Sequence, residues 1–182
     1  MKNLVIGQSG GPTAVINASL YGAVKAFKES GTDGHVLGMI NGIEGFLADH
    51  VMDLSTDLSD EELELLKLTP AAYLGSCRYK LPADLESEVY PAIFDNFREM
   101  NIGYFLYVGG NDMDTVDKLS RYAEKIGSDV KFIGIPKTID NDLVLTDHTP
   151  GFGSAAKYVA STVREIVLDA SVYQQKSVTI VE

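Results

Sequence analysis

Short apolar runs rich in β-branched and aromatic residues recur along the chain and predict strands. The run GYFLYVGG at 103–110 is apolar throughout, which is typical of a strand covered on both faces of a sheet. The other predicted strands share the same short length and lie at 3–7, 35–40, 130–135 and 177–181.

Longer segments of helical period separate these runs. The segment SDEELELLKL at 59–68 begins with Ser59, a favoured N-cap residue, followed by acidic residues in the first turn. Apolar residues recur every three or four positions in the other predicted helices, which lie at 14–30, 89–100, 112–126 and 155–170. Strand and helix alternate, so we predict an α/β fold with a doubly wound, mostly parallel sheet in three Rossmann-like layers.

Composition and charge restrict the function classes. The chain has 182 residues, a net charge of −11 and one cysteine, Cys77. An acidic chain is a poor general ligand for nucleic acid or an anionic membrane, although a local pocket could still hold a phosphorylated small molecule. No signal peptide or apolar segment of spanning length is visible, and one cysteine allows no internal disulfide, so a cytoplasmic location is expected.

The chain ends at Glu182, directly after the predicted strand 177–181. In doubly wound sheets, the loops that follow the strands build the site. Two interpretations remain: a domain whose last strand ends the protein, or residues 1–182 as a single domain from the N-terminal part of a longer two-domain chain. We favour the second.

Two glycine-marked loops follow predicted strands. Gly10 and Gly11 lie in GQSGGPTAVIN at 7–17, where backbone amides at a helix entry could bind an anion, or the glycines could serve packing. Its spacing matches neither a Walker loop nor the dinucleotide-binding pattern. In VGGNDMDT at 108–115, Asn111 and Asp112 could cap a helix or contribute to a site.

A third loop, IPKTIDND, follows the strand at 130–135. Lys137 is a point charge suited to a phosphoryl oxygen. Asp140 and Asp142 are two residues apart and would point the same way on an extended loop, so one could accept a proton while the other assists. The alternative is a solvated turn with an internal Lys–Asp pair. The loop continues into TDHTPGFGSAA at 146–156, and a loop of this length usually has a function.

These motifs resemble those of the 6-phosphofructokinases. SGGPTAVINA, YLGSCRY, VGGND, PKTIDND and TDHTPGFGSA occur in that family's order and approximate spacing, over essentially the whole chain. The resemblance implies the phosphofructokinase N-terminal domain and phosphoryl transfer to the 1-hydroxyl of fructose 6-phosphate with Mg2+. It also implies a homo-oligomer for the full-length protein.

The resemblance implies roles for individual residues. Gly10 and Gly11 would contact the phosphoryl donor, and Arg78 would steady the transferring phosphate. Asp140 would be the catalytic base, supported by Asp142, and Thr138, Ile139 and Asp140 would line the sugar phosphate. Asn111 and Asp112 would hold the metal, although many relatives have an acid in place of Asn111.

The donor is expected to be pyrophosphate. Family members that use ATP tend to have glycine where this chain has Asp112, and a carboxylate there would repel the α-phosphate of ATP. Lys137 would neutralise pyrophosphate directly, and Asn41 stands where many ATP-using members present an aromatic ring to adenine. The alternatives are an ATP-dependent 6-phosphofructokinase and a non-catalytic phosphate-binding module. Residues 1–182 alone, lacking the family's Met-Gly-Arg loop, would have little activity.

Overall fold

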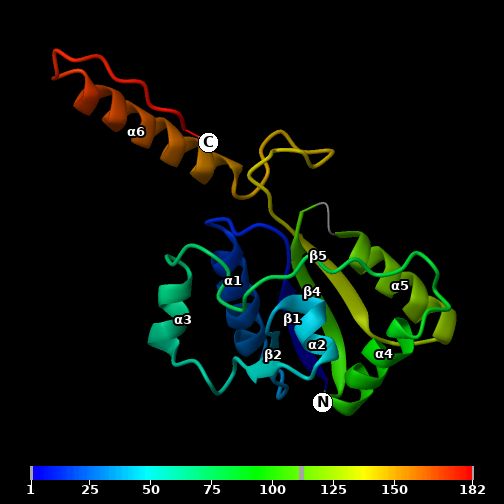
Figure 1. Ribbon diagram of the computed structural model, residues 1–182. Coiled ribbons are helices and arrows are strands. Elements are labelled where there is room, and N and C mark those ends of the chain that lie inside the picture. The colour runs from blue at the N-terminus through cyan, green and yellow to red at the C-terminus, as the bar shows by residue number, and fades with distance from the viewer. Residues whose placement is uncertain (1, 111–112, 182) are drawn as a thin grey trace.

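The structure is a computed structural model that describes residues 2–110 and 113–181 (Figure 1). The strands are β1 (Asn3–Gln8), β2 (Val36–Met39), β3 (Val51–Asp53), β4 (Ile102–Gly109) and β5 (Lys131–Pro136). The helices are α1 (Ile16–Glu29), α2 (Gly42–Leu47), α3 (Asp60–Leu66), α4 (Val89–Glu99), α5 (Asp114–Ile126) and α6 (Phe152–Ala170).

The strands form one sheet in the order β3-β2-β1-β4-β5. All neighbours are parallel except β3, which pairs antiparallel with β2 at the edge. The α/β, doubly wound and mostly parallel architecture is therefore confirmed. The chain leaves β1 toward β2 on one side and later returns as β4 on the other. The carboxyl ends of β1 and β4 thus meet at the topological switch point, where open α/β sheets bind ligands.

Side chains alternate between the two faces of the sheet, and each face is covered by its own helices (Figure 1). Val5 of β1 and Phe105 of β4 face α2, α4 and α5, together with an aromatic cluster that includes Phe94 and Phe97. Leu4, Ile6 and Val36 lie in a second cluster with residues of α1 and α3. Because β1 is the central strand and packs against a cluster on each face of the sheet, the start of the loop that follows it is held in place.

The second face is only partly covered. Tyr104 of β4 and Ile133 of β5 lie on the same face as α1, yet they are 41% and 53% exposed. The predicted long helix is present as α6, but it extends away from the sheet and none of its residues is buried (Figure 1).

The prediction of a strand at 177–181 is wrong for this structure. These residues form no strand, and Val178 and Ile180 are 91% and 90% exposed. A strand needs a partner to satisfy its N–H and C=O groups. No strand among the described residues pairs with this segment. The apolar pattern of residues 177–181 alone was therefore insufficient to predict a strand.

The other predicted elements are confirmed, with ends shifted by a few residues. Ser59 caps α3 as predicted: its hydroxyl accepts from the Glu62 amide, and the Glu62 carboxylate accepts from the Ser59 amide. The short elements α2 and β3 were not predicted. None of the helices formed by residues 2–110 and 113–181 has the length and hydrophobicity needed to span a bilayer.

Candidate active site

The glycine loop follows β1 without a break. Gln8 and Ser9 are buried, and Gly10 adopts a φ of 74°, a conformation that favours glycine. A Cβ atom added to Gly11 would meet no atom within 4 Å, so space beside this residue is open. The backbone beside Gly11 is therefore open to solvent.

The second loop approaches the third at the end of β4. The Lys137 amide donates to the Gly109 carbonyl at 2.9 Å. A Cβ atom at Gly110 would lie 2.9 Å from the Lys137 carbonyl oxygen, so this close approach requires glycine. Asn111 and Asp112, the predicted metal and donor-selectivity residues, lie outside the described residues.

Lys137 connects the first and third loops. Its side chain is only 4% exposed, and Nζ donates to the Gly11 carbonyl at 2.9 Å. Thr138 is buried as well. These two residues therefore do not belong to a solvated turn, which was the alternative interpretation of this loop.

The long loop from Lys137 to the start of α6 is braced by its own hydrogen bonds. The Thr138 amide donates to the Pro150 carbonyl at 3.0 Å, and the Thr149 hydroxyl donates to the Thr138 carbonyl at 3.1 Å. The Asp140 amide donates to the Thr138 hydroxyl at 3.0 Å. The backbone that carries Asp140 is thus tied to both ends of its loop.

Arg78 comes from a fourth loop, which is hydrogen-bonded to the first. The Gly10 amide donates to the Cys77 carbonyl at 3.1 Å, and the Ser76 hydroxyl donates to the Gly10 carbonyl at 2.6 Å. Asn41, which the sequence linked to donor choice, braces the same loop, because its backbone N–H donates to the Leu74 carbonyl at 2.8 Å. The sequence analysis did not single out Ser76, because no local sequence pattern shows that its hydroxyl contacts Gly10, 66 residues earlier.

Cys77 has a structural position in this loop. Its thiol is buried, and Sγ lies 3.7 Å from the Tyr107 hydroxyl. Burial raises the pKa of Tyr107, and the neighbouring thiol adds to the effect. The phenol is therefore neutral under ordinary conditions, and the pair anchors the loop against β4.

The first, third and fourth loops line a cavity of about 340 Å³. Its lining consists of Gly10, Gly11, Arg78, Lys80, Lys137, Thr138, Asp140 and Asp142. Among the predicted site residues that the structure describes, Ile139 alone does not line the cavity, and its side chain is half exposed. Lys80 was not predicted. Three cations and two carboxylates thus share one small space, an arrangement suited to a phosphorylated ligand and a proton acceptor.

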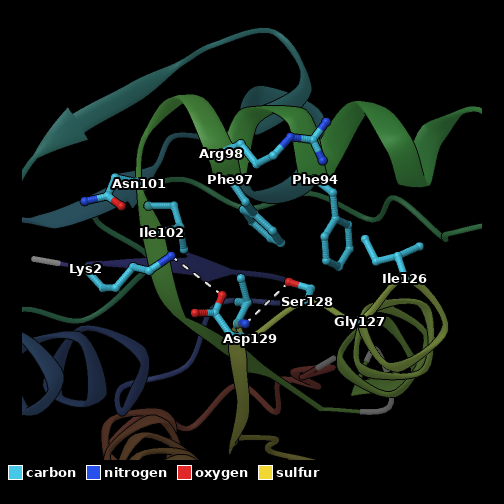
Figure 2. Close-up of a pocket in the computed structure, with 11 residues that line it drawn as sticks. Lys2, Phe94, Phe97, Arg98, Asn101, Ile102, Ile126, Gly127, Ser128 and Asp129 are labelled. Atoms are coloured by element: carbon cyan, nitrogen blue, oxygen red, sulfur yellow. Dashed lines mark hydrogen bonds and ion pairs between the residues drawn. The ribbon is translucent and has the colours of Figure 1, made fainter.

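A second cavity of about 350 Å³ lies at the opposite rim, where the strands begin (Figure 2). Phe94 and Phe97 of α4 point toward it, and Lys2 and Asp129 form an ion pair of 3.6 Å at its edge. No predicted site residue lines this cavity. The chemistry-bearing groups therefore gather at the carboxyl ends of the strands.

The sequence matches the protein family described as "Phosphofructokinase" over residues 3–182. The chain belongs to this family.

Known proteins resemble the chain in sequence and in fold. A pyrophosphate--fructose 6-phosphate 1-phosphotransferase from Halomonas elongata is 46% identical over 92% of the chain and 40% of its own length. A sulfofructose kinase from Alkalicoccus urumqiensis is 40% identical over 91% of the chain and 42% of its own length. The crystal structure of a pyrophosphate-dependent phosphofructokinase from Nitrosospira multiformis has a TM-score of 0.86 at 41% identity, covering 94% of the chain and 42% of that structure. The chain thus spans about two fifths of the length of these relatives.

Proposed function

We propose that the full-length protein containing this chain transfers a phosphoryl group from inorganic pyrophosphate to the 1-hydroxyl of fructose 6-phosphate. The observation that carries the proposal is the position of Lys137. Its ammonium group is buried, held by the Gly11 carbonyl, and shares a cavity with Arg78 and Asp140. The names of the relatives above support the choice of pyrophosphate.

The proposed reaction assigns each group a step. Asp140 accepts the proton as the 1-hydroxyl oxygen attacks phosphorus, the bond from phosphorus to the bridging oxygen breaks, and inorganic phosphate leaves. Arg78 and Lys137 stabilise the charge on the phosphoryl oxygens, which is the main requirement of phosphoryl transfer. Asp142 supports Asp140, and Thr138 and Ile139 contact the sugar phosphate.

Magnesium fits the oxygen-rich composition of this rim. Mg2+ is usually held by one or two carboxylates together with waters and substrate phosphates. The described part of the chain contains no group of three or more His, Cys, Asp or Glu residues that could form a complete metal cage. We propose that Asn111 and Asp112 hold the ion jointly with the donor. When bound, Mg2+ would neutralise charge on pyrophosphate.

A coupled assay on the full-length protein tests the donor and the acceptor. Fructose 6-phosphate is offered with pyrophosphate or with ATP, and sulfofructose is offered with each donor, since one relative is named for that sugar. We expect turnover with pyrophosphate and fructose 6-phosphate. Use of ATP with no use of pyrophosphate would refute the donor assignment.

Asp112→Gly provides a second test of the donor. If the carboxylate at residue 112 repels the α-phosphate of ATP, its removal should raise kcat/KM for ATP and lower it for pyrophosphate. Equal ATP use by the variant and the parent protein would contradict this role.

Asp140→Asn distinguishes an enzyme from a phosphate-binding module. The amide cannot accept a proton, so we expect kcat to fall by about 100- to 10,000-fold. Pyrophosphate affinity, measured by calorimetry, should change far less. Unchanged turnover would show that Asp140 is not the base.

A further inference from the structure

The segment Cys77–Leu81 alternates between the core and the cavity. Cys77 and Leu81 are 7% and 2% exposed, and Tyr79 packs partly buried against the same core cluster. Between them, Arg78 and Lys80 are exposed and both line the site cavity. In an extended segment, residues two apart lie on one face. Lys80 is therefore on the same side as the predicted catalytic arginine.

Hydrogen bonds fix this segment at both ends. At one end, the Cys77 carbonyl accepts from the Gly10 amide at 3.1 Å. At the other, the Leu81 carbonyl accepts from Lys118 Nζ at 2.8 Å. The backbone of Lys80 lies between two anchored positions, so little backbone freedom is lost when its side chain engages a ligand.

The ammonium group of Lys80 is available for a ligand. Among the described residues, neither Arg78 nor Lys80 takes part in a hydrogen bond or an ion pair, whereas Lys25, Lys67 and Lys125 pair with carboxylates. Acidic residues outnumber basic ones by 26 to 15 in the chain. Asp140 and Asp142 line the same cavity, but neither forms a described ion pair with Arg78 or Lys80. Two exposed cations that face a cavity in this state favour an anionic ligand.

We propose that Lys80 is a donor-binding residue that contacts a phosphate oxygen of pyrophosphate. This inference rests on the proposed function. It assigns the donor rather than the sugar because the loop of Lys80 is hydrogen-bonded to Gly10, the donor side of the cavity, through Ser76 and Cys77. With Arg78 and Lys137, Lys80 completes three cations around a small, highly charged ligand.

Kinetics of full-length Lys80→Met, Lys80→Arg and the control Lys131→Met test this proposal. Lys131 is also exposed, but it begins β5 at the opposite rim. For Lys80→Met, KM for pyrophosphate should rise about 10- to 100-fold, the effect of losing a charged hydrogen bond, while KM for fructose 6-phosphate stays within about twofold. Lys80→Arg should restore most of the affinity, and Lys131→Met should match the parent protein.

An unchanged KM for pyrophosphate in Lys80→Met, or a rise confined to the sugar, would overturn the assignment. Thermal unfolding of the variant should match the parent, because the side chain makes no hydrogen bond or ion pair within the described structure. If the parent protein does not use pyrophosphate, the proposed function fails. Calorimetry with magnesium pyrophosphate then tests whether Lys80 binds pyrophosphate. A tenfold weaker affinity in Lys80→Met than in the parent protein supports this role. Equal affinity in the two proteins, or no binding by the parent, overturns it.

Discussion

Lys137 shows how one side chain can assemble a site from separate loops. Its position follows β5, and its ammonium group reaches the carbonyl of Gly11, which follows β1. A buried cation is costly unless polar groups surround it, so the loops around it must keep their arrangement. Substitution here should affect both ligand binding and the geometry of the glycine loop.

Lys137→Met is the sharpest residue-level test. It removes the charge while retaining an unbranched side chain, and we expect kcat with pyrophosphate to fall by about 100- to 1,000-fold, as when one donor to a transition-state charge is lost. Lys137→Arg should not restore activity, because the 4% exposed position leaves little room for a planar guanidinium. Activity near that of the parent protein in Lys137→Met would contradict this role.

The sequence allowed prediction of the site residues that directly follow a strand. Lys137, Thr138, Asp140 and Gly11 could be placed at one rim because parallel strands end together. Lys80 and Ser76 could not, because they lie in a loop that follows no predicted strand. Their place in the site depends on hydrogen bonds to Gly10, and a contact between distant segments leaves no local pattern.

At the scale of elements, α1 holds the loop that leads to Arg78. Asn17, in the first turn of α1, is 1% exposed. Its amide group donates to the Thr69 carbonyl at 2.9 Å, and its carbonyl accepts from the Tyr73 amide at 2.7 Å. The Leu74 amide donates to Gln8 at 3.0 Å. Buried side chains of β1 and α1 therefore fix residues 69–74, from which the Arg78 loop begins.

Asn17→Ala should weaken both the fold and the activity. It removes the hydrogen bonds to the Thr69 carbonyl and from the Tyr73 amide, and two such bonds together stabilise the folded state by about 1–3 kcal/mol. We expect a lower urea midpoint and a reduced kcat, because the Arg78 loop loses its support. Ser19→Ala, two residues further along α1 at a partly buried position, is the control. A midpoint equal to that of the control would show that the loop does not depend on Asn17.

The cap of α3 predicts a pH dependence. Hydrogen bonds from the Ser59 backbone and side chain lower the pKa of Glu62 below its ordinary value of 4.5. A lowered pKa in the folded state means that this stabilisation is present above pH 4.5 and is lost as the pH falls further. Glu62→Gln should therefore differ from the parent more at about pH 7 than at about pH 3 in its urea midpoint. A difference that is constant with pH would contradict the cap as the cause.

Whether a helix or strand could be predicted depended on its length and, for strands, on the presence of a neighbouring strand. The helix at 59–68 was predicted with its cap because the signal is local. The three-residue strand β3 and the six-residue helix α2 are too short to show a period. The segment 177–181 had the composition of a strand, yet strand formation requires a neighbour that composition cannot supply.

At the scale of the whole molecule, two apolar surfaces are left largely uncovered by the described part of the chain. One is the sheet surface at Tyr104 and Ile133, and the other runs along α6, where Tyr158, Val167 and Leu168 are more than half exposed. Contiguous apolar surface usually marks a contact with another part of a protein. The chain spans about two fifths of the length of its relatives. In a protein of the relatives' full length, additional segments would be available to pack against these surfaces.

The 182-residue chain and the full-length protein should therefore differ in exposed apolar surface. We expect the shorter chain to bind more of the dye ANS per molecule and to self-associate at lower concentration in analytical ultracentrifugation. Leu168→Glu should reduce both effects in the shorter chain, because it places a charge on α6. In the full-length protein, the same substitution should lower the unfolding temperature, since it would bury that charge. Lys157→Glu, at an exposed polar position of α6, is the control. Equal dye binding by the two proteins would mean that these surfaces stay open in the complete molecule.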